Sequence, residues 1–600
     1  MTDDTTSDSR LGTLATTTLR DLRATFAAGG HNPSPEHFAA LADIAATLEA
    51  MAEGHAAPKV YLSALDPGVG KTETLVHFLR VLLRSHAHHS AGVLVCVGRI
   101  DEAKDIAGKL AEFRSSVAVV TSDEKANALG GAYAPDSAQV LITTQQRIEL
   151  TANGRRFTDL RPFYYRGGPR MVRVWDEAWL PGRPVTLNRD DILSLLKPIR
   201  APYSTLAEKL EDLSDAIRRT ADGDAVAVPD FEATCGLSLY DVLNHLGGKW
   251  GRARDDHQTA LMALLAVNGR ITRVRRDGKT GNAMLTFRDT LPADLAPLLV
   301  LDASARVRQT YRDIEEHRGG VVRLRSAVKD YSPLTFHVWR TSGSKSGFAN
   351  NADALIQGIA DAILTRPDER WLIVTHKPSA RVRDIGAALR KLLPNGDMVQ
   401  LQDEKREPGQ EGGNVRVITW GRHMATNDFR DFPNVILAGT LFLRDSAYTA
   451  LTHLAQGKDV ADGLASKAAV EATSRGEYAD MILQAVCRGR VRQLDGDRCK
   501  AMNAYIIASP QTGIPDSLDT IIFPGCRIIP WNAGPKKLPR VLASVADYLR
   551  RRIAEGVSRV PFKDIQRDLG LARNNFHKLV TGHAEWPGVM EELGLCLFGG

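Results

Sequence analysis

The chain lacks several features that would narrow its class at once. None of its six cysteines belongs to a Cys-x-x-Cys pair, which argues against a zinc ribbon or a disulfide framework and fits a reducing cytosol. No apolar run approaches the roughly 20 residues of a membrane helix. The acidic, polar start lacks the basic and then apolar order of a secretory signal. These absences predict a cytoplasmic protein that makes no use of a membrane.

Length and charge set the next bounds. Six hundred residues are too many for one hydrophobic core, so we expect about three or four domains. The hydrophobic share of 43% and the charged share of 25% are those of an ordinary soluble protein. The net charge of +6 is mild for this length and does not by itself indicate a nucleic-acid partner.

Short β-type runs alternate with helical stretches in two regions. In the first region the runs cover residues 59–65, 92–98, 116–122, 139–144 and 171–177, and helical patterns cover 72–85 and 100–113. In the second region, from about 326 to 530, the runs cover 371–376, 415–420, 434–439 and 504–509. Strands that alternate with helices predict parallel sheets with helices on their faces.

Two segments do not continue this alternation. Residues 1–30 read as a mobile tail, and residues 181–290 read as a mostly helical insertion that ends in a hairpin at 270–289. The hairpin carries basic residues that would either contact a nucleic-acid strand or simply be solvated, namely Arg273, Arg275, Arg276 and Lys279.

A glycine-rich loop lies between the first strand and the first helix. It reads LDPGVGKT, with Leu65 where the usual phosphate-binding pattern has a glycine. Backbone N–H groups and the start of the helix would surround phosphate oxygens. Lys71 would reach the β and γ phosphates, and Thr72 would ligate Mg²⁺. The predicted nucleotide-binding residues are Pro67, Gly68, Val69, Gly70, Lys71 and Thr72.

An acidic pair follows about a hundred residues later, at the end of the run VRVWDEAW. Asp176 would hold Mg²⁺ directly or through water, and Glu177 would orient or deprotonate the attacking water. The pair and the loop together predict a site that hydrolyses a nucleotide.

At this point the chain resembles the superfamily 2 helicases, the DEAD/DEAH-box relatives. That family's first motif often lacks the first glycine, as LDPGVGKT does, and its second motif, Asp-Glu-Ala-His or Asp-Glu-Ala-Asp, is DEAW here, with Trp179 in the fourth place. Weaker matches follow in the family's order at residues 93–110, 140–148, 300–305, 371–377 and 418–439, the last centred on Thr426, Asn427 and Asp428.

The run QAVCRGRVR, residues 484–492, resembles the family's sixth motif. Gln484 and Arg488 align directly, whereas the second family arginine falls on Val491, so either Arg490 or Arg492 takes its place. The resemblance implies that a guanidinium from the second domain stabilises charge on the γ-phosphate. The resemblance alone implies ATP as the nucleotide. The glutamine that many relatives use upstream of the first motif to read adenine is missing here, since the first glutamine is Gln139.

Residues 562–580 have the outline of a helix-turn-helix with its turn at Gly570. Its packing residues would be Ile565, Leu569, Phe576 and Leu579, and its outward, nucleic-acid-binding residues would be Arg573, Asn574, Asn575 and Lys578. Residues 536–580 hold eleven Lys and Arg but four Asp and Glu, an excess of seven positive charges, as expected of a phosphate-binding surface.

The prediction is therefore an α/β protein with two RecA-like domains, residues 31–180 with 291–325 and residues 326–530. The insertion at 181–290 and a helix-turn-helix domain at 536–600 complete it. The resemblance implies an ATP- and Mg²⁺-dependent helicase or translocase on nucleic acid, with DNA preferred. The insertion or the C-terminal domain would bind protein partners. Two alternatives remain open: a DNA-binding regulator or adaptor with an ATPase switch, and a packaging-type motor.

Overall fold

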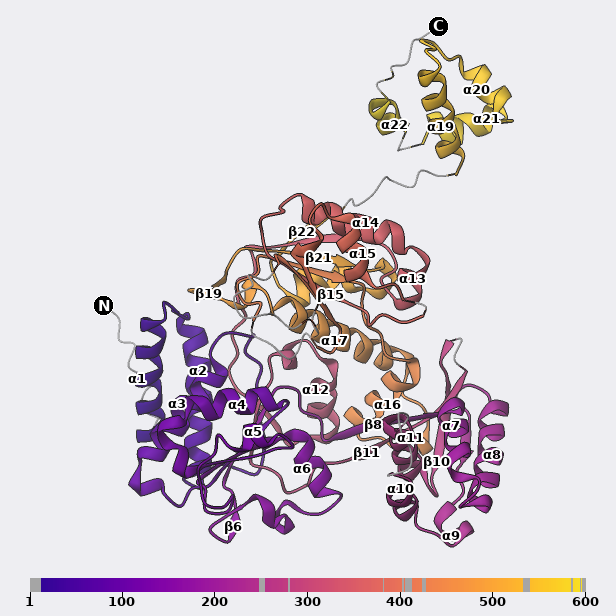
Figure 1. Ribbon diagram of the computed structural model, residues 1–600. Coiled ribbons are helices and arrows are strands. Elements are labelled where there is room, and N and C mark those ends of the chain that lie inside the picture. Colours follow the sequence, from indigo (N-terminus) through magenta and orange to yellow (C-terminus); the bar gives the residue numbers. More distant parts are fainter. Residues whose placement is uncertain are drawn as a thin grey trace. The chain divides into compact units, whose positions relative to one another are not determined.

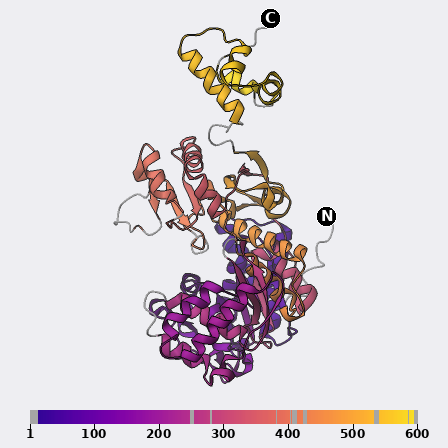
Figure 2. The same ribbon diagram turned by 90° about the vertical axis from the view of Figure 1, so that its right-hand side faces the viewer.

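The structure is a computed structural model that describes residues 12–247, 254–278, 281–380, 382–401, 404, 413–422, 428–531, 540–583, 586–593 and 595. The chain divides into two compact units, residues 1–531 and 532–600, which we describe separately. Figures 1 and 2 show the ribbon from two directions, and Figure 2 looks from the side of the insertion.

The first sheet of unit 1 consists of parallel strands in the order β13-β1-β12-β7-β2-β4-β3. Strands β2 and β7 are buried along their whole length, as expected of a parallel sheet covered on both faces. The strand bounds are β1 Val60–Ser63, β2 Val93–Val97, β3 Val117–Val120, β4 Val140–Thr144, β7 Val172–Asp176, β12 Leu298–Leu301 and β13 Val321–Arg323.

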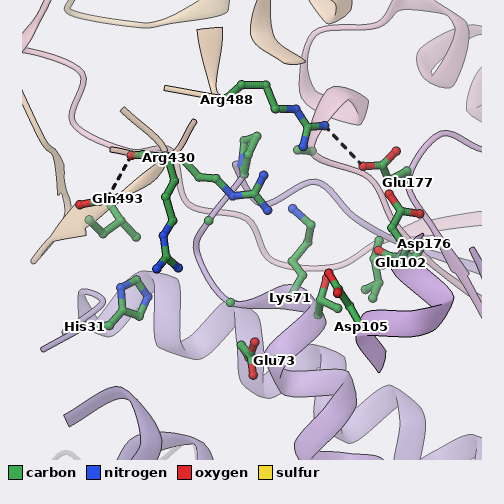
Figure 3. A pocket seen from close by; sticks show the side chains of 18 of the residues that line it. His31, Lys71, Glu73, Glu102, Asp105, Asp176, Glu177, Arg430, Arg488 and Gln493 are labelled. Carbon is green, nitrogen blue, oxygen red and sulfur yellow. Dashed lines mark hydrogen bonds and ion pairs between the residues drawn. The ribbon is translucent and has the colours of Figure 1, made fainter. Parts of the chain in front are cut away.

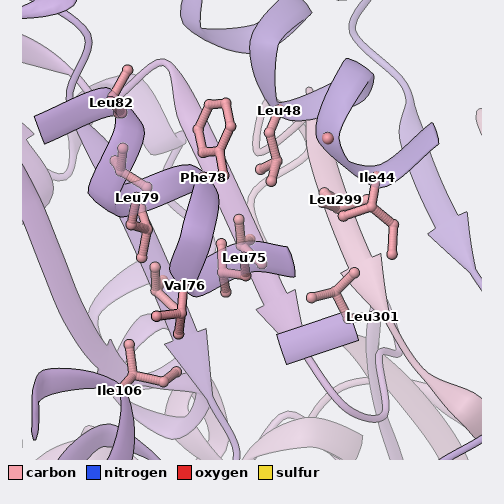
Figure 4. Packing of buried hydrophobic residues seen from close by; sticks show 14 of the residues in the cluster. Ile44, Leu48, Leu75, Val76, Phe78, Leu79, Leu82, Ile106, Leu299 and Leu301 are labelled. Carbon is pink, nitrogen blue, oxygen red and sulfur yellow. The ribbon is translucent and has the colours of Figure 1, made fainter. Parts of the chain in front are cut away.

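Helices α2 (Pro35–Ala52) and α3 (Lys71–Arg84) cover one face of this sheet (Figure 4). In α3, Leu75, Phe78 and Leu82 recur at helical spacing and are fully buried. This apolar stripe faces Ile44 of α2 and Leu301 of β12 in one core. The helix that begins at Lys71 is therefore anchored along its length.

The prediction of a tail over residues 1–30 is wrong for the part that the structure describes. Helix α1 (Thr13–Ala28) packs against α2 and α3, with Leu14, Leu22 and Phe26 buried. The backbone N–H of Leu14 donates to the Glu49 carboxylate of α2. The apolar residues of α1 repeat at helical spacing, but alanine and threonine between them reduce the contrast that identifies an amphipathic helix.

The second sheet is also parallel, in the order β16-β17-β15-β18-β21-β14-β22. We call it and its helices domain 2, and the first sheet with its helices domain 1. The predicted pair of RecA-like parallel-sheet domains is confirmed at the level of these two sheets. The strand bounds are β14 Leu334–Trp339, β15 Trp371–Thr375, β16 Val399–Leu401, β17 Val415–Thr419, β18 Asn434–Ala438, β21 Met502–Ile507 and β22 Arg527–Pro530.

The remaining helices of these domains are shorter or connect strands. In domain 1 they are α4 Ile100–Lys109, α5 Glu124–Asn127, α6 Gln145–Ala152 and α12 Gln309–Asp313. In domain 2 they are α13 Lys345–Asn350, α14 Ala352–Leu364, α15 Ile385–Leu392, α16 Asp445–Gln456, α17 Lys467–Val486 and α18 Ile514–Ser517. Two small antiparallel pairs join β5 Tyr164–Tyr165 to β6 Gly168–Pro169 and β19 Leu494–Asp495 to β20 Arg498–Cys499.

The insertion has its own core and its own sheet. Helices α7 Arg189–Ile199, α8 Ser204–Arg219, α9 Phe231–Cys235, α10 Leu239–Gly247 and α11 Arg254–Val267 pack on an antiparallel sheet ordered β8-β11-β10-β9. The strands are β8 Gly182–Asn188, β9 Ala225–Ala227, β10 Ile271–Arg276 and β11 Asn282–Asp289. Strands β10 and β11 form the predicted hairpin.

Two of the predicted basic residues of that hairpin bind protein through their side chains, whereas the Arg276 side chain is exposed. Arg273 donates to the carbonyl oxygens of Val460 (2.8 Å) and Ala461 (2.9 Å) in domain 2, and Arg275 pairs with Asp222 at 3.1 Å. Lys279 lies outside the described residues. The hairpin thus docks the insertion on domain 2.

Unit 2 contains helices α19 Arg540–Ala554, α20 Phe562–Asp568, α21 Arg573–Phe576 and α22 Trp586–Glu592, with a π turn at His577–Thr581 after α21. Ile565 and Phe576 are buried in its core, as predicted. Leu579, however, is 37% exposed and Val580 takes the buried place. The spacings i+3 and i+4 from Phe576 both lie on one helical face, so periodicity alone does not separate these two positions.

In the described part of the chain, no helix is both long enough and apolar enough to cross a membrane.

Candidate nucleotide site

The carboxyl ends of four neighbouring strands place the candidate site in domain 1. Strands β1, β12, β7 and β2 are adjacent in the sheet. Strand β1 is followed by Lys71 and Thr72, and β12 by Asp302. Strand β7 ends at Asp176 and Glu177, and Glu102 follows β2. Ligands of open α/β sheets bind at this edge, because loops from separate strands converge there.

The phosphate loop has the backbone that its glycines permit. Gly68 and Gly70 have φ of +84° and +123°, in the left-handed region that favours glycine. Leu65, at the position of the missing first glycine, is fully buried in the core under α3. The unusual residue is therefore a packing residue, and the loop itself begins at Asp66.

Lys71 points into the site from the first turn of α3 (Figure 3). Its ammonium group donates to the carbonyl oxygens of Leu65 and Asp66. Burial lowers the pKa of Lys71 to about 8, although Asp176 and Asp302 oppose that shift. A half-buried cation that donates to carbonyl oxygens is well placed to be attracted by phosphate oxygens.

Asp176 and Glu177 face the loop from the end of β7. Burial raises the pKa of Asp176 to about 7, and its carboxyl group also interacts with the Thr72 side chain. Glu177 has φ of +70°, a left-handed conformation that costs a non-glycine residue about 1–3 kcal/mol. Its backbone N–H donates to the Leu301 carbonyl at 3.1 Å, which holds the turn.

Two further carboxylates lie in the site that sequence reasoning missed. Asp302, after β12, accepts from Ser304 and from the Tyr311 hydroxyl at 2.6 Å. Burial raises the pKa of Glu102 to about 8, and Glu177 and Asp176 add to that shift. Each follows a buried strand of the same edge closely, which is the signal that would have found them.

Domain 2 provides the opposite wall. Gln484 and Arg488, near the end of α17, line the cavity together with Arg492. The Arg488 guanidinium lies 4.0 Å from the Glu177 carboxylate (Figure 3). Arg490 instead donates to the Asp431 carbonyl at 3.4 Å and lines a smaller neighbouring cavity. Of the two candidates for the second arginine, the geometry brings Arg492 to the site.

The cavity between the two walls measures about 900 Å³. Its charges are divided between the domains. Most of the acidic lining comes from domain 1, at Glu73, Asp101, Glu102, Asp105, Asp176, Glu177 and Asp302. Domain 2 supplies most of the basic lining, at Arg430, Arg488, Arg492 and Lys500, and adds two carboxylates, Asp428 and Asp431. Domain 1 adds one basic group at its centre, Lys71, and a second at the rim, Lys109. A polyphosphate with Mg²⁺ would place its own charges between these walls.

The N-terminal helix contributes to the site, a role that no sequence pattern predicted. The Phe26 ring lies so close to Gly70 that a Cβ there would approach it to 2.5 Å. The His31 ring nitrogen lies 3.2 Å from the Val69 carbonyl, and His31 lines the cavity beside Gly30. Helix α1 thereby supports the phosphate loop from outside the sheet.

The hard oxygen donors of Thr72 and Asp176 fit the preference of Mg²⁺ for hydroxyl and carboxylate ligands. In the residues that the structure describes there is no group of three or more His, Cys, Asp or Glu side chains that would hold a metal by itself. An ion at this place would need oxygen ligands from the nucleotide as well.

Other predicted motif residues are placed as follows. Trp179 is buried and its ring stacks on Tyr311 at 6.5 Å, and its backbone N–H donates to the Tyr311 hydroxyl oxygen at 2.8 Å, so its ring packs within domain 1. Asp428 lines the cavity, whereas Thr426 and Asn427 lie outside the described residues. The side chains of Arg573, Asn574, Asn575 and Lys578 are exposed on unit 2.

No family model and no curated protein matches this chain. Among solved structures, an apo form of XPD is 14% identical, covers 81% of this chain and 99% of its own, and has a TM-score of 0.46. A structure of the XPD helicase is 13% identical with a TM-score of 0.42, and covers 85% and 99%. S. cerevisiae Dbp5 bound to RNA and ADP BeF3 is 9% identical with a TM-score of 0.38, and covers 91% and 98%. Identities and TM-scores at this level assign neither a family nor an activity.

Proposed function

We propose that this protein hydrolyses ATP with Mg²⁺ in the cavity between its two RecA-like domains. One observation carries the proposal. A phosphate loop with Lys71 and an acidic pair, Asp176 and Glu177, face two arginines of the other domain, Arg488 and Arg492, across a single cavity. Hydrolysis of a phosphoanhydride needs phosphate binding, a metal, an oriented water and charge stabilisation, and these groups supply all four.

Each side chain would have one task. Lys71 and the backbone N–H groups of the loop bind the phosphates, and Thr72 and Asp176 hold Mg²⁺, which neutralises phosphate charge when bound. Glu177 orients the attacking water and accepts its proton. Arg488 and Arg492 stabilise the charge that develops on the transferred group. In the structure Arg488 lies 4.0 Å from Glu177, within reach of the same group.

We further propose that the work done by hydrolysis is movement on nucleic acid, with DNA as the preferred substrate. The acidic side chains described in unit 2 pair with arginines of the same unit: Asp547 with Arg550, Glu555 with Arg552, and Asp564 and Asp568 with Arg567. Exposed cations without an ion-pair partner among the described residues then remain, namely Arg551, Arg559, Lys563, Arg573 and Lys578. Such a surplus suits a phosphate backbone.

A DNA-binding regulator with an ATPase switch is the second candidate. The observation that favours it is that unit 2 is compact by itself and has its own core, as a recruiting module would.

The deciding experiment measures ATP hydrolysis with no nucleic acid, with single-stranded DNA, with duplex DNA and with RNA in turn, beside the Lys71→Ala variant as a blank. A translocase is expected to be stimulated most by one of the nucleic acids, and strand displacement then separates a helicase from a switch. Equal rates of hydrolysis under all four conditions would contradict the nucleic-acid part of the proposal. A rate in the Lys71→Ala variant equal to that of the wild type would contradict the proposed site.

A further inference from the structure

The phosphate loop is tied to domain 2 through contacts that no nucleotide mediates. Asp66, inside the loop, is fully buried. Its carboxylate accepts hydrogen bonds from the Arg306 guanidinium at 3.0 and 3.3 Å and from the backbone N–H of Lys329 at 3.0 Å. Neither Asp66 nor Arg306 lines the cavity, so neither would touch the nucleotide.

Arg306 reaches domain 2 with the other side of its guanidinium group. It donates to the carbonyl oxygens of Ile521 and Ile522, the latter at 2.9 Å, at the end of the π turn Leu518–Ile522. The planar fork of arginine carries five N–H donors, which lets one side chain hold a carboxylate and two carbonyl groups together. A single residue thus bridges the loop and domain 2.

Lys329 makes a second bridge of the same kind. Its side chain is buried, and its ammonium group donates to the Pro67 carbonyl of the loop and to the Arg492 carbonyl of domain 2 at 2.9 Å. The backbones are in direct contact here, because a Cβ on Gly68 would lie 2.1 Å from the Arg492 carbonyl oxygen. A buried cation is tolerated only where such acceptors surround it, so these carbonyl groups must keep their places.

We propose that Arg306 and Lys329 are positioning residues of the phosphate loop. We call them, with Asp66, the loop clasp. The clasp holds Asp66 and Pro67 in register with Arg492, so the loop has its phosphate-binding shape only while domain 2 is docked. Binding of the nucleotide by domain 1 then depends on a domain that supplies no phosphate ligand to the loop. This inference rests on the proposed nucleotide site.

The test is a fluorescence titration of the full chain with ADP that carries an N-methylanthraniloyl group, which reports binding without hydrolysis. Arg306→Ala is expected to raise the dissociation constant by about tenfold, which is comparable to the loss of one charge-assisted hydrogen bond. Arg306→Lys keeps the positive charge but lacks the planar guanidinium group, and is expected to raise the dissociation constant by about threefold. The stoichiometry should stay at the wild-type value in both.

The matched control is Arg325→Ala. Arg325 also donates two guanidinium hydrogen bonds to one carboxylate, that of Asp43, at 2.6 and 2.9 Å, but it is 56% exposed and its partner belongs to domain 1. The dissociation constant of the Arg325→Ala variant for the labelled ADP should equal that of the wild type. An unchanged constant in both Arg306 variants would overturn the clasp, and so would a lower stoichiometry at an unchanged constant, since that describes a folding defect. No binding by the wild type would instead overturn the proposed nucleotide site, and the clasp with it.

Discussion

The two parallel sheets of unit 1 have the same architecture and opposite chemistry. In domain 1 the carboxyl ends of four adjacent strands carry the phosphate loop and the carboxylates. In domain 2 the cavity-lining cations lie on connecting segments and near the end of α17, not directly at the ends of its strands. The same α/β architecture therefore occurs twice, and the segments that follow its strands give each copy different charged side chains at the cavity.

Removing the central cation of domain 1 tests this division most severely. Lys71→Ala is expected to lower the hydrolysis rate by a factor of about 10³ or more, because it removes the charge aimed at the phosphates. The fold should persist, since Lys71 contacts only loop carbonyl groups. Phosphate release and thermal unfolding would be measured together. The companion variant Glu177→Gln should bind nucleotide but hydrolyse it slowly. Normal hydrolysis by Lys71→Ala would refute the role of the loop, and normal hydrolysis by Glu177→Gln would refute the role of the acidic pair.

The cations of domain 2 should act on turnover and not on binding. Arg488→Ala and Arg492→Ala are each expected to lower kcat by about 10²–10³, with nucleotide affinity nearly unchanged. Arg490→Ala is the matched control from the same turn, and should stay within about threefold because Arg490 lines the neighbouring cavity. A slow Arg490 variant beside a normal Arg492 variant would reverse the assignment.

Unit 2 belongs to neither sheet, so its removal should leave the proposed nucleotide site of unit 1 unchanged. Deleting residues 536–600 is expected to keep basal hydrolysis and to weaken duplex DNA binding by about tenfold or more. If each of the five unpaired cations contacts one phosphate, the slope of log affinity against log salt should fall by about 4.5. A salt titration of both proteins measures this. Equal slopes would indicate that unit 2 binds protein and that DNA lies elsewhere.

The smallest expected effect concerns the protonation of domain 1. Mg²⁺ needs the Asp176 carboxylate, whose pKa is raised to about 7, so affinity for the Mg²⁺ nucleotide should be lost as the pH falls below that value. Phosphate needs the Lys71 ammonium, whose pKa is lowered to about 8, so affinity should also be lost as the pH rises above that value. Titrations from pH 6 to 9 should show a maximum near 7 to 8 and a change of up to about tenfold per unit outside it. Lys71→Arg should remove the alkaline limb alone; a flat profile in the wild type would show that neither group titrates on binding.

Local patterns determined much of this protein. The phosphate loop, the acidic pair after β7, the alternation of strands and helices and the hairpin at 270–289 were predicted because each depends on neighbouring residues: glycine for a tight turn, β-branched runs for buried strands, periodic apolar residues for helices. Gln484 and Arg488 were predicted from the resemblance to the superfamily 2 helicases instead; both line the cavity, and Arg488 lies 4.0 Å from Glu177.

Only the tertiary structure decided which distant residues meet. Asp302 and Glu102 join Asp176 because β12, β7 and β2 are neighbours in the sheet, an order that the sequence does not state. Arg492 rather than Arg490 faces the cavity because the short 3-10 turn Arg490–Arg492 directs alternate side chains apart. Helix α1 and the loop clasp exist through contacts with segments far along the chain. Sequence periodicity reports a residue's own helix or strand, whereas these contacts depend on how whole elements pack, which is set by the shape and burial of the assembled core.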